Sequence, residues 1–501
     1  MSVRTLMRVI TALAAVHASL ASSAGTTAPA AAVHYSQHCG ACHGTDRLGG
    51  MGPALLPESL ERLRPAELAD VLRHGRTATQ MPGFAAQLDE AALDGLAVWL
   101  RTAPAIAPHW DAADIRASHV VYHAPGALPA KPVFTADPTN LFLVVEAGSH
   151  HISVLDGDRL ERIHRFRTRF ALHGGPKFSQ DGRYVYMASR DGWVSKYDLW
   201  NLTYAAEIRA ALNTRNVAVS DDGKWVLAGN TLPGTLALLR ADDLSLVRVY
   251  DVRGRDGKPS RVSAVYDAAP RHSFIAALKD VPEVWELPYG DAGVPMQPRV
   301  IVLDDVLDDF YFDQGYRHIL GASRDGRGQV IDMARGRQVT ELEVSGMPHL
   351  GSGITWVRDG REVMASPNLK QGRISVIDME DWHTVGTVQT NGPGFFLRSH
   401  EDTPYVWTDA MMSPRRDTLQ VIDKQSLQVV GSVTPSPGRT AAHVEFTRDG
   451  RYALVSLMER DGAIVVYDAQ TLREVKRIPM DKPIGKYNVF NKTTRSSGTS
   501  H

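Results

Sequence analysis

One short pattern returns along most of this 501-residue chain and restricts the folds that are open to it. The pattern is a strand-like stretch that ends in an apolar residue and an acidic one. Six copies are clear: Ser153–Asp156, Ser195–Asp198, Gln329–Asp332, Ser375–Asp378, Gln420–Asp423 and Val465–Asp468. Two degenerate copies, Ala237–Arg240 and Glu283–Glu286, fill the long gap between the second and the third. The eight copies follow one another at intervals of 42 to 46 residues, which indicates one repeated supersecondary unit.

Tight turns punctuate the chain between these copies. Asp-Gly pairs, each followed by an alternating strand pattern, occur at Asp181-Gly182, Asp222-Gly223, Asp359-Gly360 and Asp449-Gly450. Four short strands per repeat are typical of one propeller blade, which buries its faces only against neighbouring blades. A β-helix would need a much shorter repeat, and a helical solenoid would show a period of about 3.6 residues that this region lacks. We therefore predict an all-β, eight-bladed propeller over residues 131–501, with seven blades as the alternative.

The two cysteines of the chain stand close together, ahead of the repeats. They form the sequence Cys39-Gly40-Ala41-Cys42-His43, the C-x-x-C-H pattern of c-type haem attachment. Thiols at this spacing add to the two vinyl groups of one haem, and the next residue, His43, can bind the iron as an axial ligand. Because no cysteine is left over, the sequence excludes disulfides and iron–sulfur clusters. It predicts one covalently bound haem c, held by Cys39, Cys42 and His43.

Helical patterns follow this motif. Apolar residues recur at helical spacing over Ser59–His74 and over Asp89–Arg101. We therefore expect a small all-α domain around the covalent haem, over residues 30–103. The Pro- and Ala-rich stretches within residues 104–130 cannot continue a helix and predict a linker.

The first 24 residues have the pattern of an export signal. Arg4 and Arg8 precede the apolar run Val9–Leu20, and small residues follow at Ser22–Ala24. We predict a signal peptide over residues 1–24 and a periplasmic protein, with an uncleaved amphipathic helix as the alternative. No later stretch is long and apolar enough to predict a membrane span. The net charge of -1 gives no basis for binding nucleic acid or an anionic membrane.

The residues around the haem motif resemble class I cytochrome c. Thr79–Phe84 is similar to the loop that carries the sixth iron ligand in that family, which makes Met81 the expected ligand and His74 its nearest competitor. A cytochrome c domain followed by an eight-bladed propeller resembles, in turn, the cytochrome cd1 nitrite reductase family. In that family the propeller axis holds haem d1 without a covalent bond. The resemblance therefore implies a second, non-covalent tetrapyrrole in this protein.

Three segments of the propeller carry this resemblance. Phe170–His173 is similar to the family stretch with the proximal haem d1 histidine, which implies that His173 binds the iron. Pro348-His349 is similar to the segment that places a histidine on the distal face, and Gly485–Asn491 is similar to the C-terminal signature of the family. A pair of histidines, His173 and His349, is therefore implied for the iron of haem d1.

One departure separates the chain from the nitrite reductases. Those enzymes have a second distal histidine in a segment where this chain reads Leu278–Glu283, with Lys279 at the position of the histidine. Reduction of nitrite needs protons, which two imidazoles supply and one lysine supplies poorly. A further histidine, His443, stands where the reductases are not expected to have one. The pattern is closer to the branch of the family that oxidises a propionate side chain of dihydro-haem d1 to the acrylate of haem d1.

This oxidation converts CH2–CH2 into CH=CH and removes two electrons and two protons, so it needs a base and an electron acceptor. His443 is the expected base, and His349 binds the iron distally or acts as a second base. Arg190 and Arg215 are candidates to bind the carboxylates of the macrocycle, and Lys177 is a candidate to replace an arginine of the reductases. We expect the electrons to leave through haem c to a periplasmic acceptor, and a cytochrome cd1 nitrite reductase to receive the finished haem d1.

Two other functions remain open for such a sequence. A divergent nitrite reductase that forms nitric oxide and a non-catalytic haem d1 carrier would share most of these motifs. The covalent haem argues against the carrier, because transport of a tetrapyrrole needs no electron relay.

Overall fold

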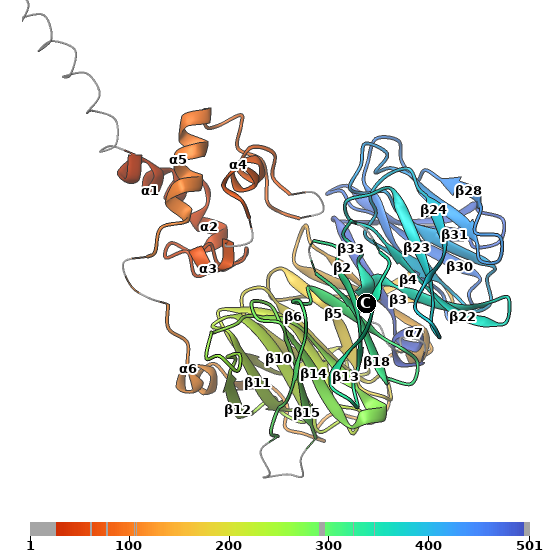
Figure 1. Ribbon diagram of the computed structural model, residues 1–501, viewed down its shortest axis with the longest axis horizontal. Helices are drawn as coiled ribbons and strands as arrows, with labels where there is room; N and C mark the ends of the chain where they lie inside the picture. The colour runs from red at the N-terminus through yellow and green to blue at the C-terminus, as the bar shows by residue number, and fades with distance from the viewer. Residues whose placement is uncertain are drawn as a thin grey trace, which may run out of the picture. The chain divides into compact units, whose positions relative to one another are not determined.

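The computed structural model describes residues 27–60, 63–76, 79–104, 106, 108–289, 296–323, 325–344 and 346–494. The side chains of residues 27–29, 58, 173 and 174 are outside that description, and so is the predicted signal peptide. The described chain divides into a helical unit, which contains most of residues 27–107, and a strand-rich unit from Pro108 onward (Figure 1). None of the helices within the described residues has the length and hydropathy that a membrane crossing requires.

The described part of the helical unit contains α1 (Thr27–His38), α2 (Gly40–His43), α3 (Pro57–Leu60), α4 (Pro65–His74) and α5 (Glu90–Leu100). The α5 helix agrees with the prediction, and the side chain of Asp89 caps it by accepting the N–H of Ala92 at 2.8 Å. The prediction of one helix over Ser59–His74 is wrong, because α3 and α4 are separate. Pro65 has no N–H and disfavours a helical Arg64, which is extended, so a new helix begins at Pro65.

The described residues of the strand-rich unit form eight antiparallel sheets, and each sheet is one propeller blade (Figure 1). The strands of a blade follow one another from the inner strand outward. Blade 1 has β33 (Pro483–Asn488), β2 (Leu141–Glu146), β3 (His151–Asp156) and β4 (Glu161–Arg167); blade 2 has β5 (Leu172–Phe178), β6 (Tyr184–Ser189), β7 (Trp193–Asp198) and β8 (Thr203–Arg209); blade 3 has β9 (Asn213–Val219), β10 (Trp225–Leu232), β11 (Thr235–Arg240) and β12 (Leu246–Asp251); and blade 4 has β13 (Val262–Ala268), β14 (Ser273–Leu278), β15 (Glu283–Pro288) and β16 (Arg299–Val302).

The remaining blades repeat this order. Blade 5 has β17 (Asp309–Phe312), β18 (His318–Ala322), β19 (Gly328–Asp332) and β20 (Arg337–Leu342); blade 6 has β21 (Ile354–Arg358), β22 (Arg361–Pro367), β23 (Arg373–Asp378) and β24 (Thr384–Gln389); blade 7 has β25 (Leu397–Ser399), β26 (Tyr405–Thr408), β27 (Leu419–Asp423) and β28 (Val429–Val433); and blade 8 has β29 (Ala441–Phe446), β30 (Tyr452–Leu457), β31 (Gly462–Asp468) and β32 (Glu474–Met480). The prediction of eight blades is confirmed.

The last strand closes the ring of blades. β33 comes from the C-terminal end of the chain, and it pairs with β2, for example through Asn488 opposite Phe142. Inner strands of neighbouring blades are in contact, including β5 with β9, β29 with β33 and β33 with β5. Within the described residues, open sheet edges remain only at the short outer strands of the blades. Closure also places the inner strands around one axis, where the candidate site lies.

The residues that revealed the repeat all lie in the third strand of a blade. The acidic residue at the end of that strand holds the turn into the outer strand. In blade 2, the carboxylate of Asp198 accepts the N–H groups of Trp200 at 2.9 Å and Asn201 at 3.1 Å. The chain then turns through Leu202, which has a left-handed φ of 52°. The repeated aspartate is therefore a turn signal in the six blades that carry it. Blades 3 and 4 have Arg240 and Glu286 in its place, and Glu286 accepts instead from Arg271 and Arg299.

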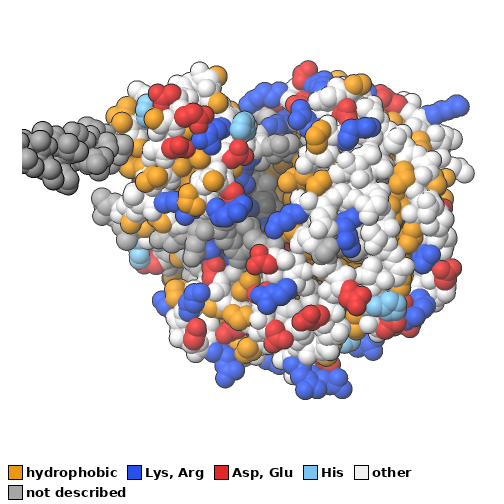
Figure 2. Space-filling view, turned by 45° about the horizontal axis from the view of Figure 1, so that its top comes forward, with side chains coloured by type: hydrophobic (Ala, Val, Ile, Leu, Met, Phe, Trp, Pro, Cys, Tyr) orange, Lys and Arg blue, Asp and Glu red, His pale blue; other side chains and the backbone are white. Residues whose placement is uncertain are grey.

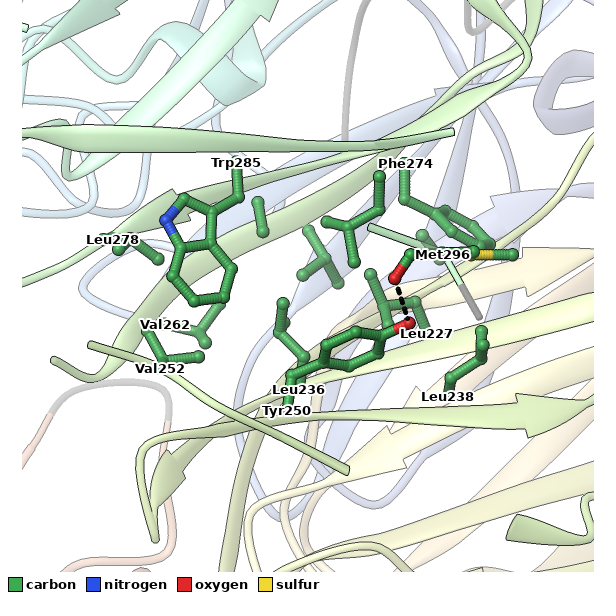
Figure 3. Packing of buried hydrophobic residues seen from close by; sticks show 14 of the residues in the cluster. Leu227, Leu236, Leu238, Tyr250, Val252, Val262, Phe274, Leu278, Trp285 and Met296 are labelled. Atoms are coloured by element: carbon green, nitrogen blue, oxygen red, sulfur yellow. Dashed lines mark hydrogen bonds between the residues drawn. The ribbon is translucent and has the colours of Figure 1, made fainter. Parts of the chain in front are cut away.

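Side chains between blades form the core of the propeller. Figure 3 shows such a cluster between blades 3 and 4, in which Leu236 and Leu238 of β11 face Phe274 and Trp285 of blade 4. The hydroxyl of Tyr250 in this cluster donates a hydrogen bond of 2.9 Å to a backbone carbonyl. Alternating apolar residues of the strands supply these contacts, and each blade is buried only when its neighbours are present.

The segment predicted as a linker has structure of its own. It contains α6 (Ala112–Ala117) and β1 (Val120–Val121), and β1 adds a fifth strand to blade 2 by pairing with β8. Ile115 of α6 is buried in the core between blades 2 and 3. These elements are too short for a periodic signal in the sequence. On the face of the molecule in Figure 2, basic and acidic side chains are interspersed, which fits the balanced net charge.

Candidate functional site

Several side chains on or next to the inner strands meet near the propeller axis, and we call them the axial cluster. The cluster is Lys177 of β5, Arg215 of β9, Asp309 of β17, His349, Phe395, Phe396, His443 of β29 and Tyr487 of β33. They come from seven of the eight blades, so only the closed ring brings them together. Four of them, Lys177, Arg215, His349 and His443, were predicted from the sequence.

His349 lies just before the short 3-10 helix η3 (Leu350–Ser352), and its side chain is buried. Its Nδ1 bonds to the backbone carbonyl of Phe395 at 2.9 Å, and its Nε2 lies 3.6 Å from Oδ2 of Asp309. Because a carbonyl only accepts, Nδ1 carries the hydrogen, and Nε2 is the nitrogen that can bind iron or take a proton. Burial lowers the pKa of His349, and the carboxylate of Asp309 opposes this effect.

His443 occupies a distortion of β29. The pairing with β30 shifts between Ala442 and Val444, and His443 has a left-handed φ of 51°. A bulge of this kind turns the side chain away from the regular alternation of the strand. The imidazole is buried, and its ring centre lies 4.7 Å from that of Phe396 and 5.3 Å from that of Tyr487.

Aromatic rings form the apolar part of the axial cluster. Phe395 and Phe396 precede β25 and are half-buried, with ring centres 4.8 Å apart. Tyr487 also packs against His443, with ring centres 5.3 Å apart. Burial raises the pKa of Tyr487 to about 12, so that its hydroxyl is protonated at neutral pH. Apolar walls with a few convergent polar groups are typical of small-molecule sites, and flat rings suit the faces of a macrocycle.

Two cations complete the cluster. Lys177 follows a bulge in β5 at Gly174–Pro176, and burial lowers its pKa to about 8 against the opposing charge of Asp309. Arg215 donates from Nε to the carbonyl of Ser263 at 2.9 Å, and its charge contributes to the lowered pKa of His349. Ammonium and guanidinium groups near an aromatic pocket fit the carboxylates of a tetrapyrrole. The donor set at the axis therefore suits haem d1 or its dihydro form.

Three further residues were predicted for the haem d1 site and are not members of the axial cluster as defined above. The backbone of His173 is part of β5 and pairs with Ala188, and its side chain is outside the described residues. Arg190 lies in the turn between β6 and β7, where its N–H donates to Ala171 at 3.1 Å. The ammonium group of Lys279, at the end of β14, lies 4.0 Å from Oδ1 of Asp308.

The haem c motif forms one helical turn in the helical unit. The N–H groups of Cys42 and His43 both donate to the carbonyl of Cys39, at 3.0 and 2.9 Å. Neither cysteine forms a disulfide, and Cys39 and His43 are both buried. Burial raises the pKa of the Cys39 thiol to about 11. Two thiols and an imidazole on one turn fit the attachment of a single haem.

Met81 and His74, the two candidates for the sixth ligand, have different surroundings. Met81 is partly buried against the apolar core that includes Cys39, Leu72 and Leu93. His74 is 70% exposed, and its Nδ1 bonds to Oδ1 of Asp70 at 2.9 Å. A thioether that faces the same core as the attachment cysteine favours Met81 as the ligand.

Sequence reasoning missed four residues that the structure brings to the axis. Asp309, Phe395 and Phe396 had no signal of their own, because their roles depend on contacts with other blades. Tyr487 lies within the C-terminal signature that was noted, without a role, from the family resemblance. Its place within that signature was the one available hint.

Comparisons with known proteins agree with both units. Residues 136–492 match the family model described as "Cytochrome D1 heme domain", and residues 26–100 match the model "Cytochrome C oxidase, cbb3-type, subunit III". A protein of Pseudomonas aeruginosa named "Dihydro-heme d1 dehydrogenase" is 60% identical over 93% of this chain and 95% of its own length. A "Nitrite reductase" of Stutzerimonas stutzeri is 22% identical over 91% of each chain.

A solved structure gives the same result. The one titled "Dihydro-heme d1 dehydrogenase NirN in complex with DHE" superposes with a TM-score of 0.83 at 59% identity, and it covers 93% of this chain and 100% of its own. The resemblance predicted from the sequence is thereby confirmed, together with the order of a cytochrome c domain and an eight-bladed propeller. The chain belongs to the cytochrome d1 haem-domain family.

Proposed function

We propose that this protein is a dihydro-haem d1 dehydrogenase, an oxidoreductase that converts one propionate side chain of its bound tetrapyrrole into an acrylate. The observation that carries the proposal is the axial cluster itself. It combines the imidazole of His443, the aromatic rings of Phe395 and Phe396, and the charges of Lys177 and Arg215, on a chain that also carries a c-type haem motif. The relative with 60% identity bears the name of this activity.

The reaction breaks two C–H bonds of the side chain and forms one C=C bond. His443 accepts one of the protons, because its buried ring lies beside the aromatic wall where the macrocycle would stack. The hydroxyl of Tyr487, held protonated by burial, lies beside that ring and orients it or passes the proton on. His173 would bind the iron of the substrate, as the family resemblance implies. His349, whose Nδ1 donates to the carbonyl of Phe395, would offer Nε2 either to that iron or to the second proton.

Charged side chains would fix the substrate in the reacting orientation. Lys177 and Arg215 bind carboxylates of the macrocycle, and Arg190 is a further candidate at the rim of blade 2. Removal of two electrons requires two transfers, because a single haem iron takes one electron at a time. When bound to Cys39, Cys42, His43 and Met81, haem c supplies this one-electron relay. The final acceptor is a separate electron carrier.

The export pattern and the identity of the product also bear on the location and the partners of the protein. We place the protein in the periplasm because residues 1–24 have the pattern of an export signal. The product would then be available to a cytochrome cd1 nitrite reductase, the kind of enzyme that uses haem d1. Nitrite reduction by this chain itself is disfavoured, because Lys279 replaces a distal histidine and lies near Asp308.

One anaerobic experiment tests the proposal. The purified protein with oxidised haem c is mixed with dihydro-haem d1 at two or more protein molecules per pigment, so that two haem c groups can take the two electrons. Haem c reduction is followed by absorption, and the extracted pigment is identified by mass. We expect reduced haem c and a product that has lost two hydrogen atoms. Release of the unchanged pigment would favour a carrier instead. Turnover of nitrite to nitric oxide without conversion of the pigment would favour a divergent reductase.

A further inference from the structure

The carboxylate of Asp409 lies behind the axial cluster and is itself almost fully buried, at 2% exposure. It follows β26 directly and accepts three backbone N–H groups. Oδ1 accepts those of Phe395 and Met411, each at 3.0 Å, and Oδ2 accepts that of Phe396 at 2.7 Å. Two of these charge-assisted bonds hold the Phe395–Phe396 loop, which directly precedes β25, and the third is local, from a residue just after Asp409.

The bonds to Asp409 hold the backbone of Phe395 and Phe396 where the pairing between β25 and β26 has already ended. Ladder pairing between β25 and β26 ends at Leu397 opposite Thr408, so Phe395 and Phe396 lie just beyond the ladder. The loop has little room to shift, because a Cβ on Gly394 would collide with the carbonyl oxygen of Asp409. The position of the two phenylalanines therefore depends on the carboxylate.

Each phenylalanine contacts one of the two histidines of the cluster. The carbonyl of Phe395 accepts the hydrogen bond from Nδ1 of His349, and the two rings are 4.2 Å apart. The ring of Phe396 packs against His443 at 4.7 Å. Phe395 and Phe396 are neighbours in the chain, so a single loop sets the orientation of both imidazoles.

We propose that Asp409 is a positioning residue, which fixes the orientation of His349 and His443 together through the Phe395–Phe396 loop. The expected effect of Asp409 on turnover rests on the proposed function. Asp409 lies behind the loop, and its carboxylate is used by backbone N–H groups, so it acts without touching the substrate.

The first test replaces Asp409 by Asn. An amide has one acceptor oxygen and a donor group in place of the second oxygen, so the N–H of Phe396 or of Phe395 loses its partner. We expect kcat for conversion of dihydro-haem d1 to fall by about tenfold to a hundredfold, since small displacements of catalytic groups have effects of that size. KM is expected to change little, because the cations of the cluster are not involved.

Asp423→Asn is the control for the loss of a carboxylate charge in the same blade, because all three of its donors reach Oδ1 and an amide oxygen can keep them. Asp423 ends β27 in the same blade, and its carboxylate also holds a turn through three donors, the N–H of Gln425, the N–H of Ser426 and the hydroxyl of Ser426. The turn that it holds is remote from the axial cluster. We expect this variant to keep kcat at the wild-type value. Equal losses of kcat in the two variants would overturn the inference.

A double-mutant comparison separates positioning from a general loss of structure. In a chain that already carries His443→Ala and His349→Ala, Asp409→Asn is expected to lower the remaining rate no further, because the groups it positions are gone. A loss of the same factor as in the wild-type chain would contradict the inference. If Asp409→Asn does not fold, Phe396→Leu is the second variant, because it removes the ring that contacts His443 and leaves the carboxylate in place. It is expected to lower the rate in the wild-type chain and not in a chain that carries His443→Ala.

A second measurement needs no turnover. Diethyl pyrocarbonate modifies imidazoles, and peptide mass mapping reports the rate at each histidine. We expect His349 and His443 to react faster in Asp409→Asn than in the wild type or in Asp423→Asn. Unchanged rates would overturn the inference about Asp409 even where the wild type converts the pigment. Suppose that His349 and His443 are modified faster in Asp409→Asn but that the wild-type protein converts no dihydro-haem d1. This result would overturn the proposed function and would still support the positioning role of Asp409.

Discussion

The side-chain nitrogen of Lys486 donates a hydrogen bond to the backbone carbonyl of His443, at the bulge that turns this histidine toward the axis. The same group bonds to the hydroxyl of Ser456 at 3.0 Å. Lys486 has no exposed surface, and burial lowers its pKa well below the ordinary value for lysine. A buried lysine in the middle of an inner strand therefore ties β33 to the distorted part of β29.

Lys486→Met tests the importance of this contact. Methionine has a similar length but no donor, so the carbonyl of His443 is left without this bond in a buried place. We expect the free energy of unfolding to fall by about 1–3 kcal/mol and turnover to fall as His443 becomes mobile. Denaturant unfolding and the rate of haem c reduction by the substrate measure the two effects.

Lys196→Met is the control for that variant. Lys196 lies in β7, away from the axis, and its ammonium group donates to the carbonyls of Ala241 at 2.8 Å and Asp242 at 2.9 Å. A similar loss of stability with normal turnover is expected. If both variants lose the same fraction of turnover, the contact with His443 has no special role.

His443→Ala is expected to remove the base while leaving the substrate site. General base catalysis contributes about 10²–10⁴-fold, so the rate of haem c reduction should fall by that factor, with binding of dihydro-haem d1 nearly unchanged. Stopped-flow absorption under anaerobic conditions measures the rate. His164→Ala, in which the lost imidazole contacts Tyr197 outside the axial cluster, is expected to behave as the wild type. A normal rate in His443→Ala would assign the base elsewhere.

The pKa of Lys177 predicts a pH dependence of substrate binding. With a pKa of about 8, the lysine is charged below pH 8 and becomes neutral as the pH rises above it. A neutral amine attracts a carboxylate less, so we expect KM for dihydro-haem d1 to increase as the pH is raised from 7 to about 9. Lys177→Arg should abolish this increase, because arginine stays charged. An equal increase in wild type and variant would show that another group titrates.

The sequence was informative where a local signal exists. The six repeated aspartates predicted the blades because each one, like Asp198, holds the same short turn. The haem motif at Cys39–His43 was equally local. His349 and His443 could be predicted only through the resemblance to a family, since an isolated histidine has no pattern of its own.

The remaining site residues depend on contacts between distant parts of the chain. Asp409 holds Phe395 across a hairpin, and Tyr487 reaches His443 only after the last strand has closed the ring. Neither relationship leaves a periodic or spaced signal in a single sequence. The helix boundary at Pro65, by contrast, has a local signal in the sequence, because proline favours the first position of a helix. The prediction followed the apolar spacing over Ser59–His74 and did not use that signal.

Met81→His tests the sixth ligand of haem c. A thioether ligand favours reduced iron relative to a second imidazole, so the substitution should lower the reduction potential of haem c, by an amount on the order of 0.2 V within the range of about 0.8 V that axial ligands span. A lower potential weakens the driving force for electron removal, and haem c reduction by the substrate should slow accordingly. Spectroelectrochemical titration measures the potential. His74→Ala is the control, because His74 is exposed and bonded to Asp70, and it should leave the potential unchanged. A potential that responds to His74→Ala and not to Met81→His would make His74 the ligand.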